Sequence, residues 1–174
     1  MSSLSYTIGI DFGGVLSEHD GGDAAHMSTV INMKGAIESV TKLKSEMGHK
    51  LLIVSFCGAP RARETKASMD ESGMSALFDD QFYVSKREHK RYICKHFGCD
   101  VMIDDRAGIL DDVKAMNPTI VTILFGKDDP GEQNKKRHLW AKDWEQVVEI
   151  ISGLVGPKRE PDLSIDIVPY CHRV

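Results

Sequence analysis

The sequence predicts an α/β fold: a Rossmann-like three-layer sandwich whose mainly parallel, five-stranded sheet lies between two helix layers. Three apolar runs, LLIVS, VMIDD and TIVTILF, are continuous rather than alternating, which is typical of strands buried on both faces of a parallel sheet. Amphipathic helical spacing recurs between these runs. Strands that alternate with helices favour parallel pairing through right-handed crossovers. The chain length of 174 residues corresponds to about one domain.

The order of strands and helices follows from the apolar patterns and the residues that interrupt them. The predicted strands are Tyr6–Asp11, Lys50–Ser55, Gln81–Val84, Val101–Asp104 and Thr119–Phe125. The predicted helices carry the apolar stripes Ile37–Met47, Pro60–Met69, Tyr92–Phe97, Ile109–Met116 and Trp140–Ile151. Gly48, Gly73, Gly98 and Pro118 follow the first four stripes and are typical helix stops.

The C-terminal part has a different composition. Three prolines follow Gly156, so residues 1–155 are expected to form the main domain and residues 156–174 a tail. Leu163, Ile165 and Ile167 alternate with polar residues in that tail. The alternation leaves two alternatives open, an extended end or a strand added to the sheet edge.

Composition excludes some classes of function. The net charge is −4, with 22 basic and 26 acidic residues, which argues against a large nucleic-acid footprint. The short basic run Lys135–His138 is expected to be a solvated surface turn. No segment resembles a secretory signal or approaches the ~18 apolar residues of a membrane span. Four cysteines without CxxC spacing indicate reduced thiols and a cytoplasmic location.

Polar side chains follow four of the predicted strands. Asp11 ends the first, Ser55 the second, and Asp104 and Asp105 the fourth, while Lys86 and Lys90 follow the third. Each acid or hydroxyl alone is more often a turn or helix cap, and each lysine alone is more often a surface residue. Because ligands bind beyond the carboxyl ends of parallel strands, where the strand order reverses, we expect these side chains to converge.

An acid pair, a lysine and a hydroxyl at one edge predict a phosphoryl site. Asp11 and Asp104 provide the carboxylate oxygens that Mg²⁺ prefers, and a lysine would balance their charge and that of phosphate. Ser55 and the backbone N–H groups of Phe56 and Cys57 would bind phosphoryl oxygens. Asp11 can then attack phosphorus and form an aspartyl-phosphate that water cleaves.

In this order the motifs resemble those of phosphatases of the haloacid dehalogenase (HAD) superfamily. The motifs are Asp11-Phe12-Gly13-Gly14-Val15-Leu16, Ser55 at the end of LLIVS, a lysine in SKREHKRYIC, and Ile103-Asp104-Asp105-Arg106. The resemblance covers about residues 6–151 and implies a nucleophilic role for Asp11. It implies a magnesium site formed by Asp11, the Gly13 carbonyl, Asp104 and Asp105. The lysine is expected to be Lys90, whose helical face continues into Ile93 and Phe97, with Lys86 as the alternative.

Gly13 departs from the family pattern. Family phosphatases usually have a second aspartate there, which protonates the leaving group and activates water; such help is worth ~10²–10⁴-fold. Glu18, His19 and Asp20 are candidate replacements. The alternatives to a phosphatase are a binding or regulatory protein with impaired catalysis, and a related chemistry such as dehalogenation or phosphonate cleavage. Gly13 and Gly14 would let the backbone approach metal and phosphate closely.

Access to the site is expected to be open. Ser17–Met33 and Ala59–Gln81 are the gaps in which the family inserts caps, and both fall below the ~40 residues that an independent core needs. A capless member of the family is therefore predicted, with a phosphorylated substrate that can be macromolecular, or with a second subunit of a homo-oligomer over the site. Arg61, Arg63 and Arg106 lie near the expected rim, where each is either a substrate contact or a surface charge.

Overall fold

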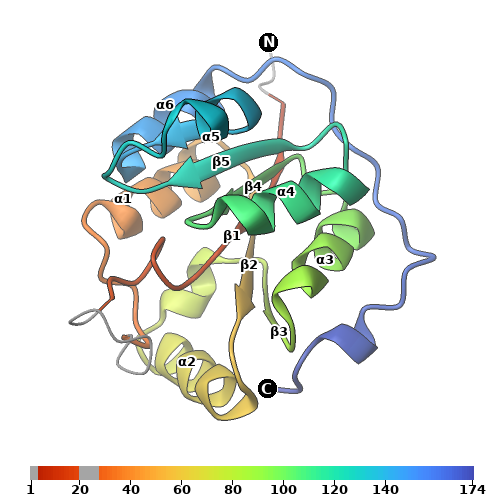
Figure 1. Cartoon of the computed structure of the whole chain (residues 1–174). Helices are drawn as coiled ribbons and strands as arrows, with labels where there is room; N and C mark the ends of the chain where they lie inside the picture. The colour runs from red at the N-terminus through yellow and green to blue at the C-terminus, as the bar shows by residue number, and fades with distance from the viewer. Residues whose placement is uncertain (1–3, 20–27) are drawn as a thin grey trace.

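Six parallel strands form one sheet in the computed structural model, which describes residues 4–19 and 28–174 (Figure 1). The strand order is β3-β2-β1-β4-β5-β6. The strands are β1 (Thr7–Ile10), β2 (Lys50–Phe56), β3 (Asp80–Val84), β4 (Val101–Asp104), β5 (Val121–Phe125) and β6 (Leu139–Ala141). The predicted α/β fold with its parallel sheet is confirmed, with six strands rather than five.

Helices connect the strands, as the sequence predicts. The α-helices are α1 (Ala36–Thr41), α2 (Ala59–Glu71), α3 (Lys90–Phe97), α4 (Ala107–Met116), α5 (Glu132–Arg137) and α6 (Trp144–Ser152). Short helical segments are η2 (Lys42–Glu46), η3 (Met74–Leu77), η4 (Arg87–His89) and η5 (Val168–Tyr170). No helix in the described residues is long and apolar enough to cross a bilayer.

Two local predictions are wrong. Trp140 belongs to β6, not to the last helix, because the Asp143 side chain accepts the Gln146 N–H at 2.9 Å and begins α6 only after that cap. The run Lys135–His138 is not a turn: Lys135 pairs with Glu132 at 3.0 Å within helix α5. His138, which follows α5, is buried.

Each face of the sheet has its own core. Leu51 and Ile53 of β2 pack with α1, α2 and α6, whereas Leu52 and Val54 pack with α3 and α4. Figure 1 shows α1 and α6 on one side of the strands and α3 and α4 on the other. Because both faces are covered, the strand is apolar at consecutive positions.

The strand order reverses at β1. Ile8 of β1 pairs with Leu51 of β2 on one side and with Val101 of β4 on the other. The carboxyl ends of β1, β2 and β4 therefore lie side by side at one edge of the sheet. This is the position at which open α/β sheets bind ligands.

The C-terminal segment, residues 156–174, wraps around the domain. The Arg159 guanidinium donates to the Cys99 carbonyl and to Asn117 Oδ1, both at 2.7 Å. The segment then passes α3 and ends beside β3 (Figure 1), where Cys171 forms an isolated antiparallel bridge with Val84. The segment has no regular strand: it includes η5 (Val168–Tyr170) and a single bridge to the edge of the sheet.

Candidate active site

Three carboxylates and one lysine meet at the carboxyl edge of the sheet. Lys90 Nζ lies 2.9 Å from Asp11 Oδ1 and 2.7 Å from Asp104 Oδ2. Asp11, Asp104 and Asp105 each bring a carboxylate oxygen within 4.8 Å of the others. Asp104 follows Ile103 at the end of β4, and Lys90 is the first residue of α3. Both of these side chains are at most 1% exposed, so water contributes little to their solvation.

Burial and mutual repulsion control the protonation of this cluster. Burial, with the negative charge of Asp104 as the second cause, raises the pKa of Asp11 well above its ordinary value. The same two causes raise the pKa of Asp105. Burial alone would lower the pKa of Lys90, but the negative charges of Asp104 and Asp11 have the larger combined effect, so the pKa of Lys90 is raised overall. Lys90 is therefore charged, and the three acids together carry surplus negative charge that a proton or a cation must offset.

A tight loop places Asp11. The Asp11 N–H donates to the Ile103 carbonyl at 2.9 Å, so the backbone stays in the sheet for one residue beyond β1. The Phe12 carbonyl then accepts the N–H groups of Leu16 and Ser17 at 2.9 and 3.0 Å and closes the loop. Trp144 Nε1 donates to the Val15 carbonyl at 2.8 Å and anchors the loop on α6. The loop is thus held rigidly above the sheet edge.

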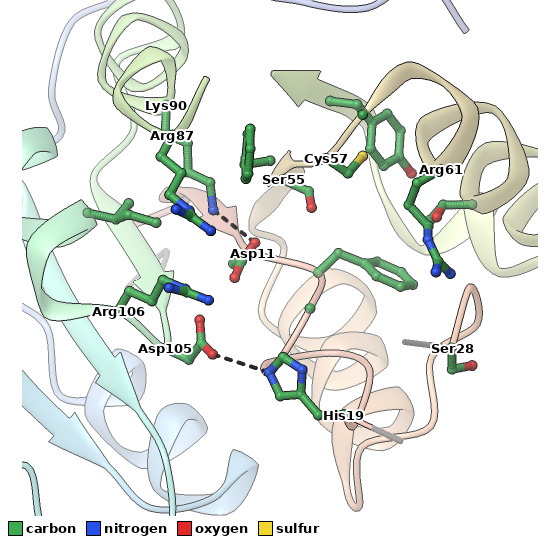
Figure 2. Close-up of a pocket in the computed structure, with 17 residues that line it drawn as sticks. Asp11, His19, Ser28, Ser55, Cys57, Arg61, Arg87, Lys90, Asp105 and Arg106 are labelled. Carbon is green, nitrogen blue, oxygen red and sulfur yellow. Dashed lines mark hydrogen bonds and ion pairs between the residues drawn. The ribbon is translucent and has the colours of Figure 1, made fainter. Parts of the chain in front are cut away.

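Asp11 lies in a cavity of about 310 Å³ (Figure 2). The lining residues come from the Asp11 loop, the end of β2, the start of α2, η4 with α3, and the start of α4: Asp11, Phe12, Gly13, His19, Ser28, Ser55, Phe56, Cys57, Gly58, Arg61, Thr65, Tyr83, Arg87, Lys90, Asp105, Arg106 and Ile109. Burial raises the pKa of the Cys57 thiol to about 11, so this thiol is protonated at neutral pH. The cavity combines a lysine and hydroxyl donors, which suit an oxyanion such as phosphate, with carboxylates, which suit a cation.

No family model matches the chain. A curated bacterial protein named "Putative nucleotidase OB0422", from Oceanobacillus iheyensis, is 28% identical over 115 residues. The match covers 66% of this chain and 58% of that protein. The chain therefore corresponds to little more than half of the relative's length.

Solved structures resemble the fold as a whole. An uncharacterized protein from Listeria monocytogenes serotype 4b has a TM-score of 0.61 at 16% identity, over 86% of this chain and 97% of its own. A HAD-superfamily hydrolase from Ehrlichia chaffeensis has a TM-score of 0.53 at 16% identity, over 78% and 63%. A structure named "putative HAD-hydrolase YfnB" from Bacillus subtilis, bound to magnesium, has a TM-score of 0.53 at 15% identity, over 68% of this chain and 55% of its own. The chain has a HAD-like fold.

Most of the residues predicted for the HAD-like site lie together. Lys90 is the lysine that contacts Asp11 and Asp104, whereas Lys86 is exposed and outside the cavity. Ser55, Phe56, Cys57, Gly13 and Arg61 line the cavity, as does Arg106. Arg63 is exposed and does not line it.

Sequence reasoning missed Arg87, Tyr83 and Thr65 as lining residues. Arg87 follows β3 by three positions, so the strand-end argument that selected Lys86 and Lys90 applies equally to it. Tyr83 reaches the cavity because β3 pairs with β2 and places it opposite Ser55. Thr65 lies one and a half turns into α2 and carries no signal in the sequence.

The three candidate replacements for the missing acid at Gly13 differ in their position relative to the cavity. His19 lines the cavity, and its Nε2 is 3.7 Å from Asp105 Oδ2 (Figure 2). Glu18 is exposed and does not line this cavity. Asp20 lies outside the described residues. Of these candidates, His19 is thus the described one that lines the cavity.

Gly14 holds the loop against the acidic cluster. Its φ is +78°, and a Cβ at this position would overlap the Asp105 carboxylate. A Gly14→Ala variant is expected to lose more than ~1 kcal/mol of unfolding free energy, because a side chain strains the left-handed backbone, and about tenfold or more in Mg²⁺ affinity, because Asp105 must move. Denaturant unfolding and titration calorimetry with Mg²⁺ measure the two effects.

Gly73 provides the matched control for that experiment. Its φ is +75°, but a Cβ there would have no atom within 4 Å. Gly73→Ala should therefore show the backbone strain alone and leave Mg²⁺ affinity unchanged. Equal destabilisation of the two variants with unaltered Mg²⁺ affinity in both would contradict the role given to Gly14.

Proposed function

We propose that the chain is a Mg²⁺-dependent phosphatase that hydrolyses a phosphomonoester through an aspartyl-phosphate on Asp11. The observation that carries the proposal is the buried contact of Lys90 with both Asp11 and Asp104, beside a cavity that Lys90 and Asp11 line. It is supported by the HAD-like fold and by the nucleotidase-named relative. Residues 1–155 would supply this activity.

The acidic cluster fits a divalent cation. Three carboxylates opposed by one lysine retain negative charge, and hard oxygen ligands are what Mg²⁺ selects. Asp11, Asp104 and Asp105 would hold the ion, together with the Gly13 carbonyl. When bound, it would offset the charge of the phosphoryl group during transfer.

Asp11 supplies the nucleophile. Lys90 donates to Oδ1, and no described residue donates to Oδ2, which is therefore the oxygen available to attack phosphorus. The bond from phosphorus to the ester oxygen breaks, and the leaving oxygen takes a proton from His19 or from water. Water then attacks phosphorus, the bond to Asp11 breaks, and phosphate is released with the carboxylate restored. Ser55 and the N–H groups of Phe56 and Cys57 would hold the phosphoryl oxygens.

A catalytically impaired binding or regulatory protein is the second candidate. The absence of a carboxyl side chain at Gly13 favours it, because leaving-group protonation would then depend on His19. In this case the same residues would bind a phosphorylated partner without turnover. Under either proposal the site would be capless, and the protein would be cytoplasmic.

Hydrolysis of p-nitrophenyl phosphate tests the proposal. The aryl leaving group needs little protonation, so the missing acid does not mask activity. We expect steady turnover with Mg²⁺, a loss of about a hundredfold or more with EDTA, and recovery with excess Mg²⁺. Phosphate binding by calorimetry without any turnover would instead favour the second candidate.

His19 is expected to protonate the leaving group. A His19→Gln variant should lose about tenfold or more in kcat for an alkyl phosphate such as glycerol 3-phosphate, but much less for p-nitrophenyl phosphate, since acid catalysis helps poor leaving groups most. Phosphate release measures both rates. Glu18→Gln, at the exposed neighbour, is the control and should alter neither. Equal losses for the two esters in His19→Gln would show that His19 has another role.

A further inference from the structure

Arg87 and Arg106 line the Asp11 cavity at its mouth rather than at its floor. Both are exposed, whereas the Lys90 side chain is 1% exposed and Asp11 6%. Figure 2 shows the two guanidinium groups on the side of the cavity that also holds Lys90, with Arg61 on the opposite side. The arginines therefore face the part of a ligand that projects away from Asp11.

Arg87 and Arg106 are held at the mouth by contacts other than salt bridges, although the charge of Arg106 also opposes the burial that raises the pKa of the neighbouring Asp105. The Arg87 guanidinium lies over the Phe56 ring at 4.9 Å from its centroid, which holds it at the mouth. Arg106 donates its backbone N–H to Asp104 Oδ1 at 3.0 Å, which fixes its position beside the cluster. Among the described residues, neither guanidinium forms an ion pair with a carboxylate. The donor edges of both planar groups remain available for a bidentate anion.

The positive charge at the mouth is a local feature. The chain has a net charge of −4, yet the carboxylates that line the cavity in the described part of the chain are Asp11 and Asp105, both in the acidic cluster. In the described part of the chain, the mouth thus combines two arginines with no carboxylate outside the acidic cluster. Such an arrangement attracts anions into the cavity.

We propose that Arg87 and Arg106 form a second anion subsite, and that the substrate is a small phosphomonoester whose leaving group carries a second phosphate or carboxylate. A phosphoryl group on Asp11 would be held at the floor by Lys90 and Ser55. The cavity of about 310 Å³ lies at the lower end of the ~300–1,000 Å³ typical of small-molecule sites, so it suits a compact ligand longer than phosphate alone. The inference rests on the proposed function, because it takes Asp11 as the point of phosphoryl attachment.

Binding of non-hydrolysable phosphonates tests the subsite without requiring turnover. Titration calorimetry in excess Mg²⁺ would compare propylphosphonate with propane-1,3-diyl bisphosphonate and 3-phosphonopropanoate, and the corresponding five-carbon compounds. We expect at least one compound with two anionic groups to bind about tenfold more tightly than the phosphonate of the same chain length with one. Charge-assisted hydrogen bonds to the second group would provide a gain of this size. The phosphonate and carboxylate arms identify which second anion is preferred.

Variants assign the preference to residues. In Arg87→Gln/Arg106→Gln the affinity ratio should fall to near one, and in Arg63→Gln, at an exposed arginine outside the cavity, it should stay at about ten. A ratio near one in the parent protein, or a ratio that survives the double substitution, overturns the subsite. Absence of binding by every phosphonate overturns it together with the proposed function. If the compounds with two anionic groups bound more tightly but no ester were hydrolysed, the subsite would be supported. Only the proposed phosphatase activity would then be contradicted.

Discussion

An Asp11→Asn variant is expected to lose at least about a thousandfold in kcat for p-nitrophenyl phosphate. The amide keeps the size of the side chain and an oxygen that can accept the Lys90 hydrogen bond, which is 2.9 Å long in the structure. It is not a nucleophile, however, so no aspartyl-phosphate can form. Steady-state release of nitrophenol in Mg²⁺ measures the loss.

The control for this variant is Asp128→Asn. Asp128 is exposed and lies outside the Asp11 cavity, so its substitution should leave kcat within about twofold. Thermal unfolding of both variants checks that the fold is retained. If Asp11→Asn kept a rate comparable with that of the parent, Asp11 would not be the nucleophile and the proposed mechanism would fail.

The strand ends explain why much of the site was predictable from sequence. Asp11, Ser55 and Asp104 all lie at or directly after the carboxyl ends of buried strands, and a parallel sheet brings such ends to one edge whatever the loops between them do. Lys90 was favoured over Lys86 because Ile93 and Cys94 continue its helical face, and all three are buried. Periodicity is sufficient for predictions of this kind.

Other features depend on contacts between segments that are distant in the chain. The inclusion of Tyr83 in the cavity depends on the register of β2 with β3, which single-strand patterns do not determine. The path of residues 156–174 depends on Arg159 reaching Cys99 and Asn117. The three-residue strand β6 is too short for a periodic signal. These features follow from tertiary packing and not from local sequence.

Among the proposed variants, Lys90→Met is expected to lose the most unfolding free energy. Lys90 is the buried cation between two buried carboxylates, and removing one partner of such a group leaves unpaired charge, at about 3–5 kcal/mol. Methionine retains much of the volume of the side chain, so the loss reports charge rather than a cavity. Denaturant unfolding in EDTA, with Lys86→Met as the exposed control, measures the difference.

The pH dependence of the stability loss in Lys90→Met shows whether unpaired charge or poor packing causes the loss. Burial and Asp104 already raise the pKa of Asp11 in the folded protein, and loss of Lys90 should raise it further. A carboxyl whose pKa is higher in the folded than in the unfolded state destabilises the fold as the pH rises through that range. The stability gap between parent and variant should therefore be small at low pH and widen as the acids ionise. Mg²⁺ should narrow the gap again. Without Lys90 the acidic cluster keeps more negative charge and should bind the ion more tightly than in the parent, so binding adds more stability to the variant. A gap that is the same at every pH and insensitive to Mg²⁺ would mean that Lys90 acts through packing, and that the carboxylates do not carry the surplus charge on which the proposed metal site depends.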